Sequence, residues 1–177
     1  MTRVLVVTGL GIAALVLQSV IGYQLTGRQS FVDLPLVVVV SGAIFAGPTV
    51  GLMSGTLVGL SQDALSGGVL GVAGLAKTLV GFIAGVAATQ FIVSSLLPRF
   101  VVFMAMTWVH GVCFLGVYAM IGQAGLGSPW RLLLVQSLVN AVVGVIATRL
   151  FERGPDMWRR RRRHQRHARM ERSRFSR

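Results

Sequence analysis

Long stretches with almost no charge constrain this chain most strongly. Residues 1–150 carry six basic and two acidic side chains, and over all 177 residues 54% are apolar while 12% are charged. An ordinary soluble domain has about 25% charged residues. In lipid a helix satisfies its own backbone hydrogen bonds. The sequence therefore predicts an all-α polytopic membrane protein.

Glycines, prolines and charges divide the apolar sequence into six candidate spans. They are Val4–Gln24, Phe31–Phe45, Pro48–Leu65, Leu70–Leu97, Phe100–Ile121 and Pro129–Phe151. The second and third fall short of the about 20 residues that cross a bilayer. They fit a re-entrant pair or one broken helix as well as two spans, which leaves five spans as an alternative. We expect residues 1–152 to form a compact bundle of about six transmembrane helices, with the first apolar run retained as a span.

Basic residues concentrate at the C-terminus, where residues 153–177 hold eleven of the seventeen. Cytoplasmic flanks of membrane spans are enriched in Lys and Arg. An even number of spans then places both termini in the cytoplasm, and the loop carrying Arg99 faces the same side. We expect residues 153–177 to form a disordered cytoplasmic tail, because they show no periodic apolar face.

Apart from arginines and Glu152 at or near span ends, three charged residues fall within the predicted spans: Asp33, Asp63 and Lys77. The predicted topology places both acids at the outer ends of their helices, and Lys77 about 10 Å below that side at the usual rise per residue. Charges inside a span usually face the bundle interior and find partners. We expect Lys77 to pair with Asp63 or Asp33 in one intramembrane charge site. In the alternative, Lys77 extends to the headgroups and the acids cap helix ends in water.

Four glycines recur at four-residue intervals, at Gly47, Gly51, Gly55 and Gly59, and Asp63 occupies the next place. We call these four residues the glycine series. Small residues at this spacing let membrane helices approach closely. The series predicts either tight packing inside this bundle or a face for a partner's helix, and both interpretations stay open at this point.

The basic tail contains five consecutive arginines, Arg159, Arg160, Arg161, Arg162 and Arg163. Arginines at a membrane surface attract anionic lipids by about 1 kcal/mol each. The run fits contact with anionic lipid or with an acidic cytoplasmic partner. Nucleic-acid binding is not expected, since no folded reader or aromatic platform accompanies the charges.

The sequence contains only weak indications of a catalytic or metal-binding site. Ser54 precedes Gly55, and His110 could act as a base, which is similar to intramembrane serine proteases; however, Leu52 stands where their Gly-x-Ser-Gly motif needs glycine. The lone Cys113 allows no thiolate metal site and no intrachain disulfide. We therefore expect a protein that is not an enzyme, without a cofactor or a metal.

Several short motifs resemble the rod shape-determining protein MreD family of bacterial inner membranes. The residues that carry the resemblance are Leu17 and Gln18, then Val32 to Pro35 around Asp33, then Gly51, Gly55, Gly59, Gln62 and Asp63, then Gly68, Leu70 and Gly71, and finally Leu79, Val80 and Gly81. Two features depart from the family pattern. Val32 replaces the proline that usually precedes the aspartate, and the arginine tail is not a family feature.

The resemblance implies a non-enzymatic scaffold subunit of the cell-elongation (peptidoglycan synthesis) machinery in the bacterial inner membrane. It implies direct binding of MreC, and a shared complex with RodA, its penicillin-binding protein partner and MreB. Members of the family are also similar to the six-helix substrate-binding components of energy-coupling vitamin transporters. The alternative function is therefore that of a transporter subunit that takes its substrate from the outer side.

Overall fold

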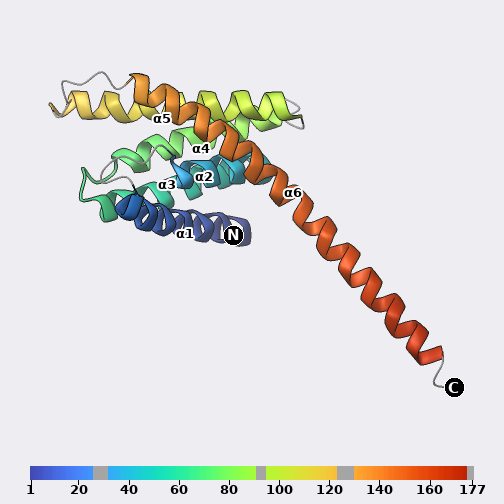
Figure 1. Cartoon of the computed structure of the whole chain (residues 1–177). Helices are drawn as coiled ribbons and strands as arrows, with labels where there is room; N and C mark the ends of the chain where they lie inside the picture. The colour runs from blue at the N-terminus through green and yellow to red at the C-terminus, as the bar shows by residue number, and fades with distance from the viewer. Residues whose placement is uncertain (26–31, 91–94, 123–129, 175–177) are drawn as a thin grey trace. The chain divides into compact units, whose positions relative to one another are not determined.

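The computed structural model describes residues 1–25, 32–90, 95–122 and 130–174, with side chains as far as residue 20 in the first range and residue 152 in the last. These ranges contain six α-helices and no strand (Figure 1). The helices are α1 (Thr2–Leu25), α2 (Leu34–Ala46), α3 (Pro48–Ser66), α4 (Val72–Gln90), α5 (Leu96–Met120) and α6 (Trp130–Arg174). The predicted all-α class is confirmed.

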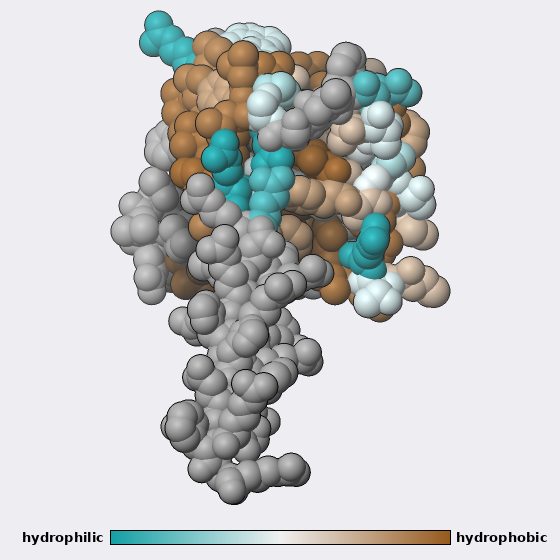
Figure 2. Space-filling view, turned by 90° about the vertical axis from the view of Figure 1, so that its right-hand side faces the viewer, coloured by the Kyte–Doolittle hydropathy of each residue, from teal (hydrophilic) through white to brown (hydrophobic). Residues whose placement is uncertain are grey.

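Among the residues that the structure describes, four helices are long and apolar enough to cross a membrane: α1, α4, α5 and the part of α6 up to Glu152. The helix α2 is apolar but has only 13 residues. Figure 2 shows brown, hydrophobic residues over much of the described surface on the face it presents. These features support a membrane protein, while the count of six spans and the cytoplasmic termini stay predictions.

Two predicted helix boundaries are wrong. Helix α4 is described from Val72 to Gln90, and Leu96 and Leu97, predicted to belong to the same span, lie in α5, which begins before Pro98. Pro98 therefore lies in the first turn of α5 and does not separate two spans. It fits there because the first backbone N–H groups of a helix have no partner within the helix. Arg99 follows it inside α5 and is 3% exposed, not in a loop.

The chain divides into two compact units, Met1–Val145 and Ile146–Arg177. In the first unit, α3 and α4 form the most extensive helix pair. Helix α2 packs on both of them, α1 packs on α2 and α3, and α5 packs on α4 and α2. In the second unit, α6 continues to Arg174 through the segment expected to be disordered.

Helix α1 meets its neighbours through small residues. A Cβ placed on Gly11 would collide with Val58 of α3, and one placed on Gly42 of α2 would collide with Val7 of α1. The opposite side of α1 exposes large apolar side chains, including Leu5 and Val16. One side of α1 is thus fitted to the bundle, and the other suits contact with lipid.

Candidate functional site

The candidate site begins at Asp33, the N-cap of α2. Its Oδ1 accepts the backbone N–H of Leu36 at 2.9 Å, and Pro35 lies in the first helical turn. An aspartate before such a turn strongly favours the start of a helix. Its carboxylate accepts a hydrogen bond from a backbone N–H that has no partner within the helix, and proline has no N–H that would need one. Asp33 is 4% exposed. The cap therefore carries a carboxylate into the interior of the first unit.

Lys77 supplies the charge opposite to that carboxylate. Its side chain is wholly buried, and its Nζ donates to Asp33 Oδ2 at 2.7 Å. The predicted pairing of Lys77 with one of the two acids is confirmed for Asp33. Extension of Lys77 to the headgroups is excluded by its burial.

His110 of α5 is the third member. Its Nε2 lies 3.2 Å from Lys77 Nζ and 3.9 Å from Asp33 Oδ2. A lysine ammonium only donates hydrogen bonds, so Nε2 is the acceptor in this contact. The ring is then neutral and carries its proton on Nδ1.

Three further polar side chains complete the site. Asn140 Oδ1 accepts the backbone N–H of Asp33 at 3.0 Å, and Asn140 Nδ2 donates to Thr107 Oγ1 at 3.4 Å. Gln18 Oε1 accepts the backbone N–H of Leu34 at 2.7 Å. We call Gln18, Asp33, Lys77, Thr107, His110 and Asn140 the buried polar network. It joins five helices at the N-terminus of α2, where lipid could not satisfy the free N–H groups.

Asp63 does not belong to this network, so its predicted place in a shared charge site is wrong. Its carboxylate accepts three backbone N–H groups at the start of α4, from Gly71 at 2.9 Å and from Ala73 and Gly74 at 3.1 Å each. Within the described residues its hydrogen bonds all go to this turn. The acid is used as a helix cap, since a carboxylate is favourable at a helix N-terminus.

Three of the four members of the glycine series pack inside the bundle. A Cβ on Gly51, Gly55 or Gly59 would collide with the backbone of α4, at Gly81, Lys77 and Ala73 respectively. Gly47 differs, because it has φ of 92° and open space where a Cβ would stand. It forms the link between α2 and α3, where a positive φ favours glycine. Of the two interpretations of the series, internal packing is the one that the structure supports for the three helical members.

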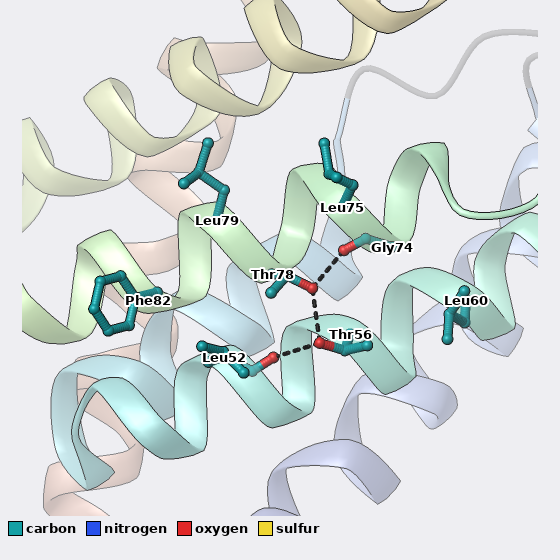
Figure 3. Close-up of a pocket in the computed structure, with 8 residues that line it drawn as sticks. All are labelled: Leu52, Thr56, Leu60, Gly74, Leu75, Thr78, Leu79 and Phe82. Carbon is teal, nitrogen blue, oxygen red and sulfur yellow. Dashed lines mark hydrogen bonds between the residues drawn. The ribbon is translucent and has the colours of Figure 1, made fainter.

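Helices α3 and α4 together line a groove of about 520 Å³ (Figure 3). Its lining residues are Leu52, Thr56, Leu60, Gly74, Leu75, Thr78, Leu79 and Phe82. The Oγ1 atoms of Thr56 and Thr78 lie 2.7 Å apart on its floor, and each lies within hydrogen-bond distance of a carbonyl one turn earlier in its own helix, so the two hydroxyl protons are shared among three contacts. The groove offers an apolar surface, with its hydroxyls already engaged.

Sequence reasoning missed two members of the network, Thr107 and Asn140, and assigned a third, His110, differently. Gln18 was singled out only as part of the resemblance. His110 was weighed only as a base for Ser54, yet Ser54 Oγ donates to Val50 O at 2.7 Å while His110 contacts Lys77. The arginines Arg159–Arg163 lie outside the residues whose side chains are described, so their role stays a prediction.

The network is built to hold helices together. Its two charges neutralise each other, and every described member bonds to another helix or to a helix terminus. No model of a known protein family matches the chain, and no curated protein or solved structure matches it either.

Proposed function

We propose that this chain is a non-enzymatic membrane scaffold of the MreD type, which binds the bitopic protein MreC in the cell-elongation machinery of the bacterial inner membrane. In this role it works in one complex with RodA, a penicillin-binding protein and MreB, and it needs no cofactor.

One observation carries the proposal: residues that carry the resemblance to MreD make contacts between helices. The side chains of Gln18 and Asp33 accept hydrogen bonds from backbone N–H groups at the start of α2, and Asp63 caps α4. Gly51 and Gly81 bring α3 and α4 into contact. Motifs that are scattered in the sequence therefore all contribute contacts that hold the helices of the bundle together. A rigid framework suits a protein that presents a surface to partners.

Copurification tests the proposal. The tagged chain is coexpressed with full-length MreC, extracted in mild detergent and purified, with an unrelated bitopic membrane protein as the control. Recovery of MreC, and not of the control, is the expected result. Recovery of an ATPase module together with a bound vitamin would instead support the transporter alternative and overturn the scaffold role.

A further inference from the structure

One hydrogen-bond donor of His110, the ring N–H, has no partner among the described residues. Its Nε2 accepts from Lys77, so the ring N–H is at Nδ1. In the described part of the chain, Nδ1 has no hydrogen-bond partner. An N–H that faces apolar surroundings without an acceptor is costly. An acceptor from outside the described chain would remove this cost.

His110 is also the member of the site that reaches the surface of the first unit. Its side chain is 13% exposed, whereas those of Asp33 and Lys77 are 5% and 0% exposed. Its ring stacks on Phe114 at 5.9 Å between centroids, and Phe114 lies 4.8 Å from Tyr118. These three residues recur every fourth position and are all half-buried. They form one partly open aromatic face of α5.

Depth limits what the acceptor can be. His110 is about 21 Å from the first residue of α5 and about 15 Å from its last, at 1.5 Å per residue. The hydrocarbon core is about 30 Å thick, so an α5 that spans it places His110 near its middle. Headgroup and ester oxygens are at the edges of the core, and acyl chains contain no acceptor. A polar side chain on another membrane helix can reach this depth.

Charge limits the acceptor further. Lys77 and Asp33 neutralise each other at 2.7 Å, so the site has no free charge to offset an incoming carboxylate. A neutral side chain such as Ser, Thr, Asn or Gln avoids that cost, and such residues commonly hydrogen-bond between membrane helices.

We propose that the Nδ1–H of His110 is a docking point for the transmembrane helix of the partner, which places a neutral hydrogen-bond acceptor there and packs against Phe114 and Tyr118. The inference rests on the proposed function, because it takes the bitopic partner to be MreC. It adds the contacting face and the chemistry of the contact.

Two isosteric variants separate the two nitrogens of His110. In His110→Asn the side-chain amide NH₂ can stand where Nδ1–H stands, so the docking donor is kept and the contact with Lys77 is lost. In His110→Gln the amide oxygen can stand where Nε2 stands, so the contact with Lys77 is kept and the docking donor is lost. Each variant is coexpressed with full-length MreC, and both MreC recovery and the Tm of the chain without MreC are measured.

We expect His110→Gln to bind MreC about three- to tenfold more weakly, the range of one interhelical hydrogen bond in a membrane, with Tm unchanged. His110→Asn should lower Tm and keep most of the MreC binding. A photo-crosslinking residue at Phe114 should capture MreC, while one at the exposed Leu5 of α1 should not. Parallel changes of binding and Tm in both variants would show a purely structural His110 and overturn the inference.

Unchanged MreC recovery with both variants would also overturn the docking point, while leaving the proposed function intact. Failure of the unmodified chain to recover MreC would overturn the proposed function, and the docking point with it.

Discussion

Lys77 and Asp33 are 44 residues apart in the sequence, yet their charged atoms lie 2.7 Å apart and are both buried. The pair joins the start of α2 to α4. Taking two charges out of water is expensive, and their attraction repays this only with good geometry and further hydrogen bonds. Leu36 and His110 supply those bonds. The pair therefore selects one arrangement of helices.

Replacing one partner of this pair should be severe. Lys77→Met leaves a buried carboxylate without its cation, and the free energy of unfolding should fall by about 3 to 5 kcal/mol. Adding Asp33→Asn, which keeps a capping oxygen, should recover part of the loss. Equilibrium unfolding in detergent micelles measures both. Asp63→Asn in place of Asp33→Asn serves as the control and should recover nothing, because Asp63 bonds elsewhere. Equal recovery by both second changes would contradict the assigned pair.

Glycine substitutions should separate packing sites from open ones. Gly55→Ala places a methyl group against the backbone of Lys77 and should destabilise the bundle by about 1 to 3 kcal/mol through overpacking. Gly116→Ala, where nothing lies within 4 Å, should be neutral or stabilise α5 by up to about 1 kcal/mol. Thermal unfolding compares them. Equal shifts in Tm would show that α3 and α4 are not in close contact at Gly55.

A disulfide can report whether the α3–α4 contact is made within one chain. In a Cys113→Ala background, Thr56→Cys with Thr78→Cys should oxidise readily, because the two native Oγ1 atoms are 2.7 Å apart. The expected product is an intrachain bond, seen as a faster-migrating monomer on a non-reducing gel. The single variants are the controls. A covalent dimer from the double variant would place this contact between copies of the chain.

Loss of the Asp63 cap should act locally. Asp63→Ala should cost about 0.5 to 2 kcal/mol, the usual range for a helix cap. Hydrogen exchange should speed up at the amides of Gly71, Ala73 and Gly74, which donate to this carboxylate. The matched control is Ser66→Ala, at an exposed position near the end of the same helix. Unchanged exchange at the start of α4 would argue against the cap.

The arginine run can be tested by lipid composition. Changing Arg159–Arg163 to glutamine should reduce the anionic lipid that copurifies with the chain, since each arginine near the surface contributes about 1 kcal/mol. Mass spectrometry of extracted lipids provides the measurement, and Arg3→Gln is the control. If lipid content stays the same while binding of a cytoplasmic protein is lost, the acidic-partner interpretation holds instead.

Local signals predicted the helices well where they were strong. Helix α3 begins at Pro48 as predicted, and Gly67, which ends it with positive φ, lies in the gap left between the third and fourth spans, whereas Asp33 caps α2 inside the span predicted to begin at Phe31. The helix boundary predicted at Pro98 was wrong, because proline is accommodated in the first turn of a helix as well as in a loop. The ion pair considered for Asp63 was wrong because a local partner was available. Its nearby backbone N–H groups, eight to eleven residues ahead in the chain, satisfy it before any distant cation does.

The sequence by itself determined that this protein is helical, suited to a membrane, and able to bring a helix close to another at its glycines, because apolar length and residue size are local properties. Only the tertiary structure decided that Lys77 meets Asp33, that His110 and Asn140 join them, and that the three helical members of the glycine series face α4. Those outcomes depend on how the helices are rotated and which ones are neighbours. Many pairings would bury the same apolar area, but few would satisfy these polar groups at once.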